Sequence, residues 1–296
     1  WPVFALGAFI NTLQRGSGSY ERIDAVYNEE SDIIIPENPL SLEKIESIEF
    51  DNYSFSYPGS QVKSLESFSI TVKTGETLGI VGTTGSGKTT IIRQLLRQYK
   101  LGEGKILINN SGISEYNAEN IREHIAYVPQ EHIVFSKTVY ENIRLGNMNA
   151  SREDIMAAIE HADFTKDIGT LTNGLETVTG ESGVMLSGGQ KQRLSLARAF
   201  VRAGNVLILD DSLSAVDGKT EENIIRNIAE YYPEMIKIIV AHRLSAVRDA
   251  NCIIVLQEGT IVEKGTHEEL MELKGWYYGQ FMEQNTMTTQ ESEEAE

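Results

Sequence analysis

The chain has 296 residues, of which 41% are hydrophobic and 8% aromatic, a composition typical of a soluble domain with extensions. The formal net charge of −17 disfavours nucleic-acid binding, because repulsion from phosphate backbones opposes it and no run of Lys or Arg is present. The single cysteine, Cys252, excludes an intrachain disulfide and a multi-cysteine zinc site. We interpret it as a small buried hydrophobe in a reducing compartment.

An apolar run, residues 1–13, opens the chain without an initiator Met and has the character of a cut end. Thirteen helical residues reach about 20 Å, less than the roughly 30 Å of a hydrocarbon core. We therefore expect residues 1–16 to complete a transmembrane helix that begins upstream, with Arg15 and Arg22 on its cytoplasmic side. A core helix of a soluble protein is the alternative.

Residues 17–45 are expected to form a cytoplasmic helix extension and a linker. The pattern predicts a polar helix over 15–26, and the acidic, proline-containing stretch 28–42 predicts the linker. A domain boundary falls near Glu43. After it, alternating apolar residues predict two antiparallel strands, 48–57 and 68–72, joined by a turn.

A glycine-rich segment with the spacing G-x-x-x-x-G-K-[ST] lies between a predicted buried strand, 76–81, and a predicted helix, 90–99. Its glycines let the backbone wrap a polyphosphate, with N–H groups and the helix start aimed at the oxygens. Lys88 would bring a charge to the outer phosphates, and the Thr89 hydroxyl would ligate Mg²⁺. The expected nucleotide-binding residues are Tyr57, Gly82, Thr83, Thr84, Gly85, Ser86, Gly87, Lys88, Thr89 and Thr90.

Both the loop and Tyr57 have an alternative interpretation. The loop would be an ordinary glycine-rich turn if its flanking strand and helix were absent. Tyr57 needs only an exposed ring face near the loop to stack on adenine, but a packed tyrosine at a strand end is the commoner arrangement.

Short strands are expected at 106–108 and 126–128, the second leading to Gln130 in a loop that reaches Phe135. Helical spacing of apolar residues predicts helix over 138–162, and glycines and threonines predict an irregular loop over 169–183. The residues Leu186 to Gln190 follow. Ser187 is suited to N-cap the next helix and, with two glycines, to form a second anion-binding helix end.

Carboxylates and a histidine follow two predicted strands. The apolar run 206–209 ends in Asp210 and Asp211, and the strand 237–241 ends in His242. Because ligands bind at the carboxyl ends of parallel strands, these side chains are candidates for the same site. Beyond them we expect a hairpin of strands 252–256 and 260–263, a helix over 267–273, and a disordered acidic tail, 285–296.

In this order the motifs resemble those of an ABC transporter nucleotide-binding domain, over residues 46–284. The resemblance implies an α/β fold: a P-loop NTPase core with an antiparallel β subdomain and an α-helical signature subdomain. Segments 138–143 and 259–267 are similar to those of exporters. Residues 13–16 are similar to the end of the family's sixth membrane helix.

The resemblance also implies roles for individual residues. Tyr57 matches the aromatic residue that stacks on adenine. Gln130 matches the loop glutamine that senses Mg²⁺ and the γ-phosphate, Asp210 the carboxylate that holds Mg²⁺, and His242 the switch histidine on the γ-phosphate. The implied metal ligands are Thr89, Gln130 and Asp210; the implied catalytic residues are Asp211, His242, Gln130 and Lys88. Ser187, Gly188, Gly189 and Gln190 match the signature that closes over the partner domain's ATP, and Asp217 lies in the interface loop.

One residue departs from the family pattern: Asp211 stands where the active sites carry glutamate. A general base must reach the attacking water within about 2.6–3.2 Å, and one methylene less withdraws the carboxylate by roughly 1 Å. Misplacement on that scale can cost about a hundredfold. The loop Glu176–Gly183 also differs from the exporter pattern. The departure at Asp211 resembles one half of a heterodimeric exporter with unequal ATP sites, of which this chain's own site hydrolyses slowly.

The sequence thus predicts an Mg²⁺- and ATP-dependent ATPase that powers export. Its implied partners are a transmembrane domain and a second half-transporter, in a heterodimer or a homodimer. It would lie on the cytoplasmic side of the cell membrane and bind no nucleic acid. Two alternatives remain: a soluble ABC ATPase acting on DNA, RNA or ribosomes, disfavoured by the charge and the apolar start, and a module that ATP only dimerises.

Overall fold

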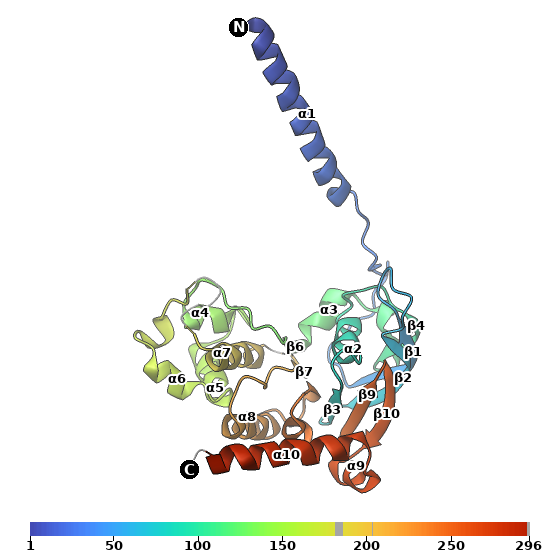
Figure 1. The fold of residues 1–296 in the computed structure, drawn as a ribbon, viewed down its shortest axis with the longest axis vertical. Coiled ribbons are helices and arrows are strands. Elements are labelled where there is room, and N and C mark those ends of the chain that lie inside the picture. Colours follow the sequence, from blue (N-terminus) through green and yellow to red (C-terminus); the bar gives the residue numbers. More distant parts are fainter. Residues whose placement is uncertain (181–185, 203, 295–296) are drawn as a thin grey trace. The chain divides into compact units, whose positions relative to one another are not determined.

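The computed structural model describes residues 1–180, 186–202 and 204–294 and divides into two units, Trp1–Ile34 and Ile35–Glu296. The first unit consists of one continuous helix, α1 (Pro2–Tyr27), which has no buried residues, and the segment that follows it (Figure 1). The two segments that the sequence separates, 1–13 and 15–26, are therefore a single element. Among the described residues, no helix combines the length and the apolar character needed to cross a membrane.

A six-stranded sheet forms the centre of the second unit, in the order β10-β9-β3-β8-β7-β6. All neighbouring strands are parallel except the hairpin of β9 and β10. The strands are β3 (Thr77–Gly82), β6 (Ile125–Val128), β7 (Val206–Asp210), β8 (Ile236–Val240), β9 (Cys252–Gln257) and β10 (Thr260–Gly265). Each corresponds to a predicted strand.

A four-stranded antiparallel sheet, in the order β2-β1-β4-β5, lies beside the central one. Its strands are β1 (Ser47–Phe55), β2 (Leu65–Lys73), β4 (Glu103–Ile108) and β5 (Ser111–Gly112). Phe50 packs edge-on against Phe68 and Tyr53, with ring centroids 5.2 and 5.7 Å apart. Such aromatic contacts hold the predicted strand pair together.

The helices of the second unit are α2 (Lys88–Leu95), α3 (Ala118–Glu123), α4 (Val139–Arg144), α5 (Arg152–His161), α6 (Thr165–Thr170), α7 (Gly188–Phe200), α8 (Gly218–Tyr231), α9 (His267–Leu273) and α10 (Trp276–Glu294). Figure 1 shows α4–α7 gathered at one side of this unit, with the antiparallel sheet at the other. This arrangement confirms the predicted α/β class with its antiparallel β and helical parts.

Two hydrophobic cores cover the two faces of the central sheet. Ile208 and Ile254 belong to the core shared with the antiparallel sheet and α2. Leu209 and Val255, the next residues on the same strands, belong to the core shared with α4, α5, α7 and α8. Burial on both faces explains why these strands are continuous apolar runs, and it fixes their carboxyl ends at one edge.

Several predictions need correction. The segment 138–162 is not one helical stretch, because α4 ends at Arg144 and α5 begins after its N-cap, Ser151. Between them, a side chain at Gly146 would collide with the Arg198 carbonyl. Cys252 is only partly buried. The described part of the predicted tail, residues 285–294, is helical, and no Gly or Pro after Gly279 interrupts that helix.

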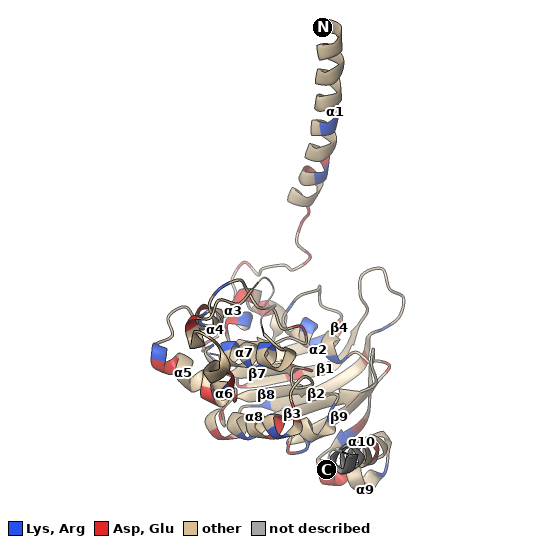
Figure 2. Ribbon diagram, turned by 60° about the vertical axis from the view of Figure 1, so that its left-hand side comes forward, with Lys and Arg blue, Asp and Glu red and all other residues tan. Residues whose placement is uncertain are grey.

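Charged residues of both signs are interspersed over the outer helices in the view of Figure 2. Among the described residues drawn there, Lys and Arg are scattered between Asp and Glu and form no continuous stripe.

Candidate functional site

The phosphate loop connects β3 to α2, as its spacing predicts. Two of its glycines are required by space as well as by backbone angle. A Cβ on Gly82, at φ +144°, would collide with the Leu256 carbonyl, and a Cβ on Gly87, at φ +106°, with that of Ser64. Only glycine fits both conditions, so the loop is held tightly against its neighbours.

Lys88 lies at the first position of α2 and is 7% exposed. Its Nζ donates hydrogen bonds to the Gly82 carbonyl at 2.9 Å and the Thr83 carbonyl at 2.8 Å. Burial lowers the pKa of Lys88, while the charges of Asp211 and Asp210 act in the opposite direction. The ammonium group is thus folded back on the loop, next to two carboxylates and within the cavity described below.

Asp210 ends β7 and faces the start of α2. Its Oδ1 accepts from the Thr89 hydroxyl and its Oδ2 from the Tyr127 hydroxyl, each at 3.2 Å. Burial raises the pKa of Asp210, because the charged carboxylate is 2% exposed. Carboxylate and hydroxyl oxygens are donors that suit Mg²⁺, which keeps waters and substrate phosphates as its other ligands. No group of three or more His, Cys, Asp or Glu that could hold a metal occurs in the described residues.

Asp211, Gln130 and His242 meet at the adjacent edge of the sheet. The Gln130 amide donates to Asp211 Oδ2 at 3.2 Å, and His242 Nε2 lies 3.8 Å from the same oxygen. Asp211 has φ +48°, and its N–H donates to the Val240 carbonyl. Three chain segments that the sequence places far apart thus converge on one carboxylate. Gln130 contacts Asp211 rather than the expected metal ligands Thr89 and Asp210.

Tyr57 combines the two arrangements that the sequence leaves open. Its ring packs edge-on against Phe55 and Tyr99 at 5.1 Å, and its hydroxyl lies 3.0 Å from Thr90 Oγ1 and accepts from Arg93 at 3.2 Å. It also lines the phosphate-loop cavity. The tyrosine is therefore both packed and placed beside the loop.

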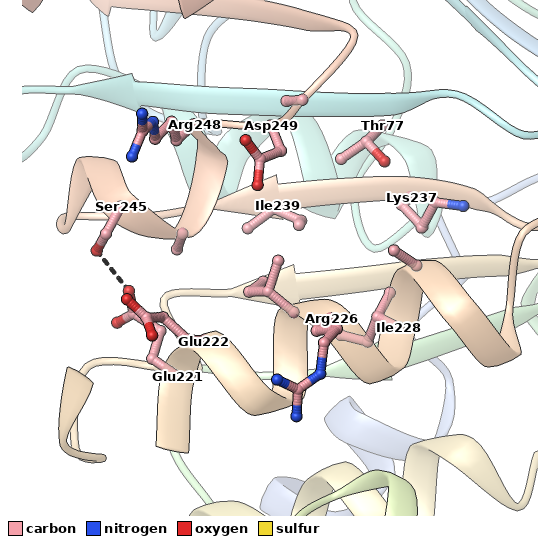
Figure 3. Close-up of a pocket in the computed structure, with 14 residues that line it drawn as sticks. Thr77, Glu221, Glu222, Arg226, Ile228, Lys237, Ile239, Ser245, Arg248 and Asp249 are labelled. Atoms are coloured by element: carbon pink, nitrogen blue, oxygen red, sulfur yellow. Dashed lines mark hydrogen bonds between the residues drawn. The ribbon is translucent and has the colours of Figure 1, made fainter. Parts of the chain in front are cut away.

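A cavity of about 320 Å³ joins these groups. Its lining residues are Tyr57, Ser64, Thr84, Gly85, Gly87, Lys88, Thr89, Thr90, Gln130, Asp210, Asp211, Val240 and His242. A larger cavity, about 490 Å³, lies between α8, β8 and the short helix η4 (Leu244–Val247), but contains none of the predicted site residues (Figure 3). The candidate site is therefore identified by its chemistry rather than by its size.

The signature residues lie outside this cavity. Ser187 caps α7, as predicted: its Oγ accepts from the Gln190 N–H at 3.3 Å, and the Gln190 side chain accepts from the Ser187 N–H at 3.0 Å. Gly188 is exposed and Gly189 is partly exposed. Asp167 accepts from Gln190 and forms an ion pair with Arg193, which fixes the first turn of α7. The helix start that the sequence predicts as a second anion-binding end is therefore present, and its Ser187 and Gly188 are exposed.

Asp217 is also absent from the cavity. Its carboxylate caps α8 by accepting from the Thr220 N–H at 3.0 Å and from the Thr220 hydroxyl at 2.8 Å, and these hydrogen bonds lower its pKa. The loop Glu176–Gly183, noted for its unusual sequence, is described only to Gly180, and residues 181–183 lie outside the described part of the chain.

Sequence reasoning missed Tyr127 and Arg93. Tyr127 reaches Asp210 because β6 pairs with β7, and Arg93 reaches Tyr57 from the second turn of α2. The signal for Tyr127 was its place one residue before the end of a strand that leads to Gln130. Using that signal requires the strand order.

The chain is similar in sequence to a known protein family and to individual known proteins. The sequence profile of the family described as ABC transporter matches residues 65–214. The chain is 48% identical over 291 residues to the probable multidrug resistance ABC transporter ATP-binding/permease protein YheI of Bacillus subtilis, covering 98% of this chain and 50% of that protein. It is 40% identical over 277 residues to the multidrug resistance-like ATP-binding protein MdlA of Escherichia coli, covering 94% and 47%.

Among solved structures, a bacterial Atm1-family ABC exporter with ATP bound superimposes with a TM-score of 0.88 at 33% identity, over 94% of this chain and 49% of that one. The chain thus spans about half the length of the relatives it matches. The resemblance that the motifs predict is confirmed. With its phosphate loop, its paired aspartates and its signature helix in place, the chain belongs to the ABC transporter family and carries one of that family's nucleotide-binding domains, which are ATPases.

Proposed function

We propose that this chain is the ATP-binding and hydrolysing part of an exporter half-transporter. The observation that carries the proposal is the convergence of Lys88, Asp210, Asp211, Gln130 and His242 on one cavity beside the phosphate loop. The similarity to YheI, MdlA and an Atm1-family exporter supports the assignment to exporters rather than to soluble ABC ATPases.

The chemistry assigned to the site is in-line attack of water on the γ-phosphate of ATP. Loop amides and Lys88 stabilise the charge that spreads over the transferring group, and such electrostatic stabilisation supplies most of the rate. Thr89 and Asp210 would hold Mg²⁺, which neutralises phosphate charge when bound. Asp211, held by the Gln130 amide, accepts the proton of the attacking water, and His242 donates a hydrogen bond to the γ-phosphate.

A second nucleotide-binding domain completes the site. The signature Ser187–Gln190 lies at a helix N-terminus, where Ser187 and Gly188 are exposed, and does not border this chain's own cavity. A helix end of this kind binds anions, so it suits the ATP of a partner domain packed head to tail. Closure of two such domains would bury two ATP molecules, and opening after hydrolysis would reset the membrane helices.

The exposed apolar residues of the loop after Gln130 are an argument for a contact between this loop and a membrane domain. Ile133 and Phe135 are 58% and 49% exposed and border a separate cavity of about 430 Å³ with Pro129, Tyr127 and Arg198. Exposed apolar groups around a hollow are typical of an interaction site. Because the same loop carries Gln130, a contact there would link the ATP site to the membrane domain, with this domain on the cytoplasmic side.

The shorter side chain of Asp211 supports unequal ATP sites. Its carboxylate is occupied by the Gln130 amide and lies beside His242, and it is shorter by one methylene than the family's glutamate. We therefore assign slow hydrolysis to the site built on this chain's phosphate loop. The intact signature of this chain would serve a faster site on a different partner chain, in a heterodimer.

Substitution of Lys88 tests the function as a whole. Lys88→Ala removes the cavity's ammonium group, and we expect at least a tenfold loss of ATP affinity and a roughly hundredfold loss of hydrolysis at this site. The measurements are nucleotide binding and single-turnover hydrolysis in the complete protein. Lys105→Ala, on the exposed side of β4, is the matched control and should change neither. Unchanged affinity and turnover in a folded Lys88→Ala protein would refute the proposal.

A further inference from the structure

The loop that carries His242 is held by the C-terminal helix α10. The Gln284 amide of α10 donates to the His242 carbonyl at 2.9 Å, and its Oε1 accepts from the Leu244 N–H at 3.0 Å. One planar side chain thus spans the backbone on both sides of Arg243. Two simultaneous hydrogen bonds fix position and orientation more strictly than one does.

Gln284 is itself placed by a well-anchored helix. Tyr277 is completely buried, its hydroxyl lies 2.9 Å from His267 Nδ1, and its N–H donates to Glu263. Phe281 packs on His267 with ring centroids 4.7 Å apart. Tyr277, Phe281 and Gln284 stand at i, i+4 and i+7 and therefore share one face of α10. The face that packs on the domain is the face that reaches the His242 loop.

The same loop is bound from the other side by the start of α8. Arg243 donates to the Val216 carbonyl at 2.8 Å and lies 3.5 Å from the Glu221 carboxylate. The Ser245 hydroxyl donates to Glu221, which is 2% exposed, as Figure 3 shows. Val216 directly precedes Asp217. The loop is therefore fixed at its backbone by α10 and at its side chains by the segment that includes the interface loop.

We propose that Gln284 is a positioning residue for His242: by holding the peptide of His242 it keeps the imidazole beside Asp211 and toward the γ-phosphate, so that α10 contributes to the competence of the ATP site. This inference rests on the role of His242 in the proposed function. In this proposal Gln284 acts through its two hydrogen bonds to the backbone of the loop.

The test is Gln284→Leu, which keeps the size of the side chain and removes both hydrogen bonds. Gln280→Leu is the matched control, because Gln280 lies one turn earlier on α10 and its amide donates only to Glu283 among the described contacts. Both are made in an Asp211→Glu background, where hydrolysis at this site is expected to be faster. The complete protein is assembled with its partner, whose own site is blocked.

We expect Gln284→Leu to lower the single-turnover rate about tenfold with unchanged ATP affinity, and Gln280→Leu to change neither. The decisive measurement combines Gln284→Leu with His242→Ala. If Gln284 acts through His242, the double variant hydrolyses ATP at the rate of His242→Ala alone.

Two results would overturn the inference. One is an unchanged single-turnover rate in Gln284→Leu. The other is that Gln284→Leu lowers this rate by the same factor whether residue 242 is His or Ala. An equal loss would mean that Gln284 only stabilises the domain. Failure of the proposed function has a different signature, because the parent protein itself would then not bind and hydrolyse ATP in a Lys88-dependent manner.

Discussion

At the scale of single residues, the backbone conformation of Asp211 matters as well as the length of its side chain. The residue has φ +48°, a left-handed conformation that aspartate adopts more readily than glutamate. Its N–H is fixed on the Val240 carbonyl of the neighbouring strand. The carboxylate therefore starts from a defined point at the end of β7, and a longer side chain would extend it farther into the cavity.

Asp211→Glu should accelerate hydrolysis at this site about tenfold to a hundredfold, because the extra methylene brings the base to the attacking water. We also expect a small decrease in Tm, because glutamate adopts the left-handed backbone conformation less readily than aspartate. The measurement is the single-turnover rate, with Asp211→Asn as the matched control that keeps the size of aspartate and removes the base. Equal rates for wild type and Asp211→Glu would contradict the assignment of a weak site.

The sequence predicted those site residues that a motif or a strand end places, and missed those that only contacts between distant segments bring to the site. Lys88 and Thr89 follow from the spacing of the phosphate loop, since the motif contains both the loop and the helix start. Tyr127 reaches Asp210, and Gln284 reaches His242, only because distant segments become neighbours. No local pattern of apolar or polar residues contains that information.

At the scale of elements, the strands were predicted better than the helices around them. The central strands are apolar on both faces, a pattern that few other structures produce. The 138–162 segment has helical spacing throughout, yet it breaks into α4 and α5. The cause is tertiary: α7 passes so close that Gly146 meets the Arg198 carbonyl, and Ser151 then caps a new helix.

Asn142 joins α4 to α7 and to the loop before α4, and should be important for stability. It is completely buried, and its amide donates to the carbonyls of Phe135 and Thr138, while its Oδ1 accepts from Arg198 and from the Phe135 N–H. Asn142→Ala leaves several buried groups without partners, so we expect a loss of about 2–4 kcal/mol in the free energy of unfolding.

Urea unfolding of the complete protein measures this loss. Asn149→Ala is the matched control, because Asn149 is exposed in the turn between the two helices and should change stability by less than about 0.5 kcal/mol. Similar midpoints for the two variants would show that the network around Asn142 contributes little.

At the scale of the whole molecule, the proposed function gives the domain two half-sites, each for a different nucleotide. In that proposal the cavity with Lys88 contains the groups for phosphate binding and water activation, whereas the signature at the start of α7 does not border this cavity. Function in such an arrangement depends on a second domain, and a change at the signature should act on the partner's ATP.

The substitution Gly188→Asp tests the signature half-site independently of the chain's own cavity. A Cβ at Gly188 has no neighbour closer than 4.0 Å, and an acidic residue in the first turn of a helix is favourable, so the fold should be unchanged. In the assembled protein the new carboxylate would face the partner's phosphates, and we expect hydrolysis at the partner's site to fall by at least a hundredfold. ATP binding to this chain's own cavity should be unaffected.

Gly169→Asp, on the exposed α6, is the control and should leave both the partner's hydrolysis and this chain's ATP binding unchanged. Full hydrolysis by Gly188→Asp would mean that the signature does not close over a partner's nucleotide, whereas a loss of ATP binding in the chain's own cavity would mean that the two half-sites are not independent.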